Sequence, residues 1–138
     1  MKRSVIVDGD KEFIAFAERQ LVLSGYQVST FTDFEQFLKY LSANPELVIV
    51  GDKLPDRPDA LESIRATRKA APRSFIVHFG NPTESDRAEQ AIAAGASEFI
   101  EKNTATFVRL RTSLDQQKGQ TPNQLSSILN KLKKVFIG

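Results

Sequence analysis

Two acids and one lysine are the residues of this 138-residue chain whose placement points most directly to chemistry. Asp8 follows the apolar run "SVIV", Asp52 follows "LVIV" and Gly51, and Lys102 closely follows "EFI". Each of these runs is short and strongly apolar, as is typical of a strand buried on both faces. If the strands are parallel neighbours, the three side chains meet at one edge of the sheet, where open parallel sheets place their chemistry.

The elements that must position these residues alternate between strand and helix. Runs rich in β-branched and aromatic residues predict strands at 4–7, 26–31, 46–50, 74–79 and 98–100. The segments between the strands carry apolar residues at helical spacing and are joined to the strands by short turns. Such alternation indicates an α/β fold, with parallel strands, right-handed crossovers and helices on both faces of the sheet.

Polar residues mark where the predicted helices begin. Asp10 is placed to cap the first helix. Thr32 and Glu35 have the spacing of a capping box and predict the start of the second helix. The third helix is predicted over 59–71 and is stopped by Pro72.

The composition excludes several kinds of site. The chain has no cysteine, so it has neither a disulfide framework nor a thiolate zinc site. Its single histidine, His78, lies in an apolar strand, and we interpret it as structural rather than as a phosphate acceptor or metal ligand. The start of the chain lacks the pattern of a secretory signal and no apolar run reaches membrane-spanning length, so we expect a cytoplasmic protein without a membrane partner.

The chain changes character after Lys102. Residues 1–101 carry 12 Lys and Arg against 16 Asp and Glu, a net charge of −4, whereas residues 102–138 carry 7 against one, a net charge of +6. We predict one domain over 1–138, with a core formed by 1–103 and 121–138 and an inserted helical segment at 104–120. The last segment supplies the helix that closes the fold.

Three motifs, in this order along the chain, resemble the receiver domain of two-component response regulators. "VIVDGDKEF" is similar to the acidic first loop of that family, "NPELVIVGDKLPD" to its third strand and following loop, and "GASEFIEKN" to its fifth-strand segment, which a lysine closes. The resemblance implies a flavodoxin-like five-stranded parallel sheet in the order 2-1-3-4-5. It also implies a signalling role in a phosphorelay rather than an enzyme activity.

The phosphoacceptor position is where this chain departs from the family. The family's acceptor aspartate lies four residues before the loop proline, and counting back from Pro55 gives Gly51. Asp52 is one residue further on, and because successive side chains of a strand point to opposite faces, we expect its carboxylate to face away from the pocket. A bulge at the strand end would reverse that expectation. Otherwise Asp52 is expected to cap its own loop.

The other positions of the family's site are altered too. Asp8 matches the first metal-binding acid, but Gly9 takes the place of the second, and Phe79 or Gly80 takes the place of the phosphoryl-binding hydroxyl. Lys102 matches the family's lysine, and without an acceptor we expect it to pair with Asp8. Too few hard oxygen ligands remain for Mg²⁺, so we expect no cofactor.

We therefore interpret the chain as an atypical receiver, a pseudo-receiver that binds partners independently of phosphorylation. Its expected partner is a signalling protein, an output domain or a second copy, bound through the fourth helix, the fifth strand and the closing helix. Two alternatives stay open. Asp52 acts as a phosphoacceptor with Mg²⁺, or the basic tail with Lys131, Lys133 and Lys134 binds nucleic acid or a ligand, although we consider nucleic acid the weaker expectation.

Overall fold

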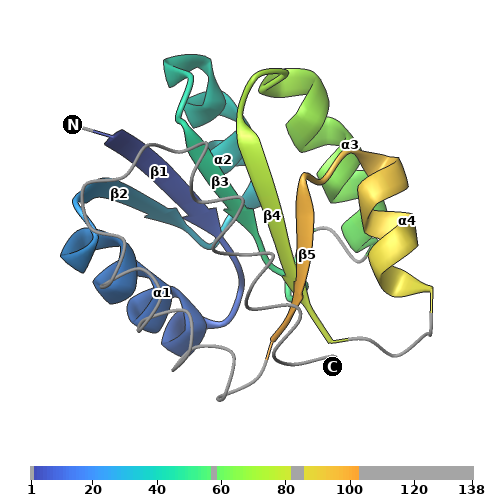
Figure 1. Ribbon diagram of the computed structural model, residues 1–138, viewed down its shortest axis with the longest axis horizontal. Coiled ribbons are helices and arrows are strands. Elements are labelled where there is room, and N and C mark those ends of the chain that lie inside the picture. The colour runs from blue at the N-terminus through green and yellow to red at the C-terminus, as the bar shows by residue number, and fades with distance from the viewer. Residues whose placement is uncertain (1, 57–58, 82–85, 103–138) are drawn as a thin grey trace.

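A five-stranded parallel sheet forms the centre of the molecule (Figure 1). The computed structural model describes residues 2–56, 59–81 and 86–102. Its strands are β1 (Lys2–Val7), β2 (Tyr26–Phe31), β3 (Leu47–Val50), β4 (Phe75–Gly80) and β5 (Glu98–Glu101). They are arranged in the order β2-β1-β3-β4-β5, and every neighbouring pair is parallel. This confirms the predicted sheet and its order.

Helices cover both faces of the sheet in the described part of the chain. They are α1 (Lys11–Leu23), α2 (Phe34–Tyr40) with the short 3-10 turn η1 (Leu41–Ala43), α3 (Ala60–Ala70) and α4 (Arg87–Ala94). Figure 1 shows α1 on one face and α2, α3 and α4 on the other. The predicted insertion at 104–120, the predicted closing segment at 121–138 and the three tail lysines lie outside the described residues.

Side-chain alternation along the strands divides the core into two clusters. In β3, Ile49 packs with α1, whereas Val48 and Val50 pack with the residues of α2, α3 and α4. All three side chains are nearly or fully buried. The strands are thus apolar on both faces because both faces are covered. None of the helices described is long and apolar enough to span a membrane.

The first three helices begin in the same way. Asp10, Asp33 and Asp59 are their N-caps, and one carboxylate oxygen of each accepts hydrogen bonds from two backbone amides of the first turn. The prediction for Asp10 is confirmed. The predicted capping box of Thr32 and Glu35 is wrong, because Asp33 occupies the cap position one residue later and its carboxylate binds the amides of the first turn.

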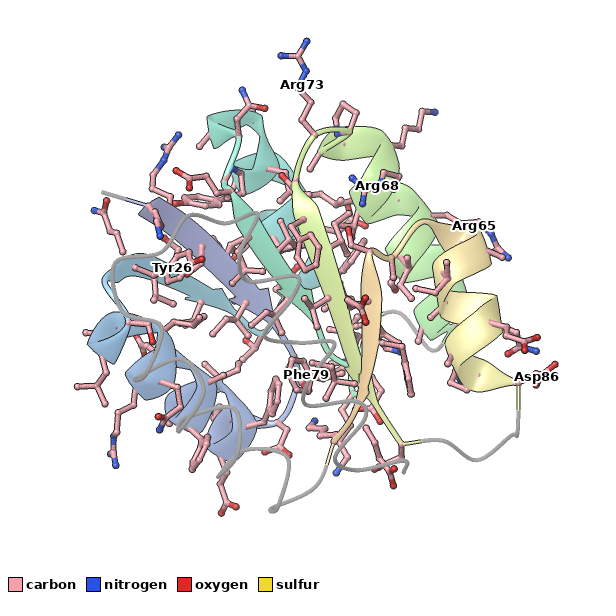
Figure 2. All side chains as sticks on the ribbon, in the orientation of Figure 1. Tyr26, Arg65, Arg68, Arg73, Phe79 and Asp86 are labelled. Atoms are coloured by element: carbon pink, nitrogen blue, oxygen red, sulfur yellow. The ribbon has the colours of Figure 1, made fainter. Side chains whose placement is uncertain are left out.

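Arg68 links three elements at the amino-terminal edge of the sheet (Figure 2). It extends from α3, and its guanidinium donates hydrogen bonds to four backbone carbonyls and one hydroxyl. The acceptors are the carbonyls of Ala71, Pro72, Ser74 and Gly95 and the hydroxyl of Ser97. These bonds satisfy the carbonyls at the end of α3 and tie them to the turn between α4 and β5.

We expect Arg68→Ala to lower the free energy of unfolding by about 2–3 kcal/mol, because several partly buried carbonyls lose their donor. Arg65→Ala, an exposed arginine of the same helix, is the matched control and should change it by less than about 0.5 kcal/mol. Urea denaturation followed by circular dichroism measures both. Equal effects of the two substitutions would contradict the assigned role of Arg68.

Candidate functional site

Asp8 is the centre of the candidate site. It follows β1, and its carboxylate is completely buried. Its Oδ2 accepts a hydrogen bond from Lys102 Nζ at 2.8 Å, and its Oδ1 accepts one from the backbone amide of Asp10 at 2.9 Å. The predicted pairing of Lys102 with Asp8 is therefore present in the structure.

Lys102 brings together the ends of three strands. Besides Asp8, its ammonium lies 3.3 Å from Asp52 Oδ1 and 3.6 Å from Asp10 Oδ2, and it sits 4.4 Å from the centre of the Phe13 ring. Its side chain is only 7% exposed. One buried cation thus faces three carboxylates that come from the β1 and β3 ends of the sheet. We call Asp8, Asp10, Asp52 and Lys102 the ionic cluster.

Burial and charge act in opposite directions on the two buried partners. Burial raises the pKa of Asp8, although the hydrogen bond from Lys102 opposes the shift. Burial alone would lower the pKa of Lys102, but the hydrogen bond to Asp8 and the charges of Asp8 and Asp52 outweigh it and raise the pKa above its ordinary value. Lys102 is therefore a firmly protonated cation in the folded protein.

Gly51 occupies the position that faces Asp8. A Cβ atom added at Gly51 would overlap Oδ2 and Cγ of the Asp8 side chain and would lie 2.8 Å from Asp8 Cβ. Gly9 is closed in a similar way, since its amide donates to the Lys53 carbonyl and a Cβ atom there would overlap that oxygen. The carboxylate of Asp8 thus fills the space in which a side chain at Gly51 would begin.

The prediction that Asp52 faces away from the pocket is wrong. β3 ends at Val50, so Asp52 lies beyond the pleated ladder and the alternation of strand side chains no longer fixes its direction. Its Oδ1 contacts Lys102, and its Oδ2 accepts a hydrogen bond from the amide of Asn81 at 3.2 Å. The expected capping of its own loop is replaced by this bond to the loop that follows β4.

Phe79 and Gly80 place no hydroxyl at the end of β4. Phe79 is 1% exposed and packs against Phe13 in the core, with ring centres 5.4 Å apart. Gly80 offers only backbone, and its carbonyl accepts a hydrogen bond from the Lys102 amide at 2.9 Å. Neither residue contributes a polar side chain to the site.

The residues described do not fit a Mg²⁺ ion. The carboxylates of Asp8, Asp10 and Asp52 all turn toward the Lys102 ammonium, and Asp10 Oδ1 is occupied by the amides at the start of α1. Within the described ranges, no group of three or more acidic, histidine or cysteine side chains is arranged to hold a metal ion. A lysine stands where the hard oxygen ligands would have to converge.

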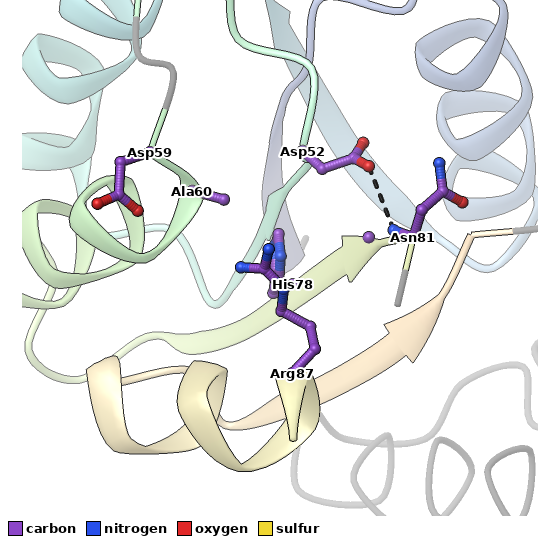
Figure 3. A pocket seen from close by; sticks show the side chains of 7 residues that line it. Asp52, Asp59, Ala60, His78, Asn81 and Arg87 are labelled. Carbon is purple, nitrogen blue, oxygen red and sulfur yellow. Dashed lines mark hydrogen bonds between the residues drawn. The ribbon is translucent and has the colours of Figure 1, made fainter. Parts of the chain in front are cut away.

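A pocket that the sequence did not predict lies beside the ionic cluster, and Figure 3 shows it. Its volume is about 410 Å³, and its polar lining consists of Asp52, Asp59, His78, Gly80, Asn81 and Arg87. The predicted structural role of His78 is consistent with its Nδ1, which lies 2.9 Å from the Val50 carbonyl, and with its ring, which packs on Phe99. The sequence spacing of Asp59 and Arg87 could not predict this pocket, because the two residues lie at the starts of two separate helices.

Comparison with known proteins places the chain in one family. The family model described as the response regulator receiver domain matches residues 5–115. The regulatory protein VirG of Rhizobium rhizogenes is 27% identical over 120 residues, which cover 85% of this chain and 50% of that protein. The chain therefore spans about half the length of this curated relative.

Solved structures show the same fold. The signal receiver domain of a LuxO repressor protein from Vibrio parahaemolyticus has a TM-score of 0.71 at 18% identity, covering 99% of this chain and 95% of that one. The beryllofluoride-activated NtrC4 receiver domain dimer has a TM-score of 0.68 at 22% identity, covering 86% of this chain and 100% of that one. At such low identities the likeness concerns the fold alone.

We expect Lys102→Met to lower the free energy of unfolding by about 3–5 kcal/mol, because the buried Asp8 carboxylate loses its cation. Adding Asp8→Asn to this variant should restore most of the loss, since no buried charge then remains. Lys69→Met, at an exposed position of α3, is the control and should have little effect. Guanidinium denaturation measures all four proteins.

The loss in Lys102→Met should also depend on pH. Burial raises the pKa of Asp8 and the hydrogen bond from Lys102 opposes this rise, so removing Lys102 raises the pKa of Asp8 further. The folded variant therefore takes up the Asp8 proton at a higher pH than the natural protein does, and its folding gains more stability as the pH falls. The deficit of Lys102→Met relative to the natural protein should therefore shrink toward acid pH. A deficit that grows on acidification would contradict the assignment of Asp8 as the unpaired charge.

We expect Gly51→Ala to lower the free energy of unfolding by about 3 kcal/mol, because the new Cβ atom overlaps the Asp8 carboxylate. Combining it with Asp8→Ala should cost less than the sum of the two single changes, since the overlapping atoms are then absent. Lys53→Ala, an exposed position of the same loop, controls for loop disturbance. Strict additivity of the two substitutions would show that they do not contact each other.

Proposed function

Because the chain belongs to the response regulator receiver domain family, we propose that it is an atypical receiver in two-component signalling that binds its partner independently of phosphorylation. The observation that carries this proposal is at Gly51. The Asp8 carboxylate occupies the space that a side chain at Gly51 would take, and it accepts a hydrogen bond from Lys102 Nζ at 2.8 Å. Lys102 supplies the positive charge of the ionic cluster and pairs with Asp8 directly, so the Asp8 carboxylate is compensated by a side chain of the protein.

The arrangement also supports a fixed conformation. The ionic cluster ties the ends of β1, β3 and β5 together through one buried ammonium. Neither of the last two residues of β4 carries a hydroxyl, since Phe79 belongs to the core and Gly80 is bare backbone. In this proposal the domain signals by binding its partner, without a chemical step of its own. We also propose that it acts in the cytoplasm.

The partner surface that we propose is formed by α4, β5 and the closing segment predicted over 121–138. β5 is an edge strand of the sheet, and Ile92 on α4 is 44% exposed. A second copy is one candidate occupant, since the NtrC4 relative forms a receiver domain dimer. An output domain is another, since the VirG relative is about twice as long as the matched region.

A second function is supported by one observation. Asp52 turns toward Lys102, at 3.3 Å, and its side chain remains 20% exposed beside the pocket. It therefore has access to solvent and lies next to an amide donor, the Asn81 N–H. Phosphorylation of Asp52 is the alternative to a phosphorylation-independent receiver.

Acetyl phosphate with Mg²⁺ separates the two functions. We expect no phosphoryl adduct on the natural chain by intact-mass spectrometry under conditions that label a receiver with an acceptor aspartate. Asp52→Asn should give the same result. An adduct that Asp52→Asn abolishes and Asp86→Asn preserves would establish the phosphoaccepting function instead.

A further inference from the structure

The pocket beside the ionic cluster is lined mainly by polar side chains, together with Ala60 and Gly80. Asp52 and Asp59 line it from the connection between β3 and α3, whereas His78 and Arg87 line it from the end of β4 and the start of α4 (Figure 3). Its volume of about 410 Å³ lies within the range of small-molecule sites. Figure 3 shows Asp59 and Asp52 on opposite sides of the pocket, with His78 and Arg87 between them.

His78 presents a hydrogen-bond acceptor to this pocket. Its Nδ1 lies 2.9 Å from the Val50 carbonyl, which only accepts, so the proton is on Nδ1 and Nε2 carries a lone pair. His78 is 1% exposed, and among the residues described its Nε2 has no hydrogen-bond partner. Burial lowers the pKa of His78, which keeps the ring neutral. His78 Nε2 can therefore accept a hydrogen bond from a group in the pocket that it lines.

Gly80 leaves this acceptor uncovered. A Cβ atom at Gly80 would lie 2.9 Å from His78 Nε2, and both residues line the pocket. The absence of a side chain at the end of β4 therefore has a second consequence, since it opens the imidazole nitrogen to a small molecule.

Arg87 supplies the complementary group. It lines the pocket from the first residue of α4 and is half-buried, and its guanidinium has no hydrogen bond or ion pair within the described residues. Guanidinium groups match carboxylates in geometry and charge. The carboxylates of Asp52 and Asp59 would repel a simple anion, and the guanidinium of Arg87 would repel a simple cation.

We propose that this pocket binds a free α-amino acid, whose carboxylate pairs with Arg87 and whose ammonium donates to His78 Nε2 and to one of the acidic side chains that line the pocket. The zwitterion supplies both signs of charge in one small molecule. Its ammonium also offers a donor to His78 Nε2. This inference goes beyond the proposed function and rests on the pocket alone. If amino-acid binding fails, the proposed receiver function can still be tested, and the reverse also holds.

The single histidine makes the test specific. Long-range ¹H–¹⁵N NMR of the full chain resolves both ring nitrogens of His78, and each common L-amino acid is titrated to about 10 mM, which largely saturates even a millimolar Kd. We expect a saturable shift of the Nε2 resonance with at least one amino acid. Acetate and methylammonium, which carry one charge each, should give none.

Matched variants locate the binding. Arg87→Gln should weaken the affinity about tenfold or more, because a charge-assisted pair is lost. Gly80→Ala should abolish the shift by covering Nε2. Arg65→Gln, an exposed arginine of α3, should leave the affinity within about twofold.

Three results would overturn the proposal: no shift with any amino acid, a saturable shift with acetate or methylammonium alone, or unchanged affinity in Arg87→Gln. Gly80→Ala also introduces a close contact with Phe99, and if that variant does not fold, Arg87→Gln decides the question.

Discussion

One buried ammonium organises the working end of this domain. The Lys102 side chain is only 7% exposed, and its ammonium lies within 3.6 Å of three carboxylates, so its charge is compensated inside the protein rather than by solvent. A buried carboxylate such as Asp8 is tolerated only when paired and hydrogen-bonded, and Lys102 and the Asp10 amide meet both conditions. The position of Asp8 in turn requires a glycine at 51, because the two side chains would share one space. The glycine at 51 and the ion pair between Asp8 and Lys102 therefore depend on each other.

The parallel sheet could be predicted from the sequence because it depends on patterns that many residues repeat, whereas the order of its strands was implied by the resemblance of three motifs to receiver domains. β2 was predicted with its observed bounds, and the other strands within two residues, since buried parallel strands are short apolar runs bounded by breakers. The cap of α2 was missed because Thr32 and Asp33 are adjacent candidates, and the choice between them rests on local backbone angles that the spacing does not specify. Such choices involve about one hydrogen bond.

The site could be predicted only in part, for a related reason. Strand parity describes residues inside a ladder, and β3 ends at Val50, two residues before Asp52. Beyond that point the direction of a side chain follows its strongest electrostatic partner, here Lys102, and the amide of Asn81. Pairing of Lys102 with Asp8 was predictable because both positions belong to motifs. The pocket was not predictable, since Asp59 and Arg87 approach it from helices that are far apart in the sequence.

Loss of side chains can open a site as well as close one. Glycine at 51 leaves a space that the Asp8 carboxylate fills, whereas glycine at 80 leaves the imidazole nitrogen of His78 facing a pocket. The two glycines lie at the ends of neighbouring strands, so the same edge of the sheet carries both the space that Asp8 fills and the pocket that His78 lines. Because Asp52 contacts Lys102 on one side and lines the pocket on the other, a charged ligand in the pocket would act on the ionic cluster through this one carboxylate. Asp52 is therefore the one residue that the ionic cluster and the pocket share.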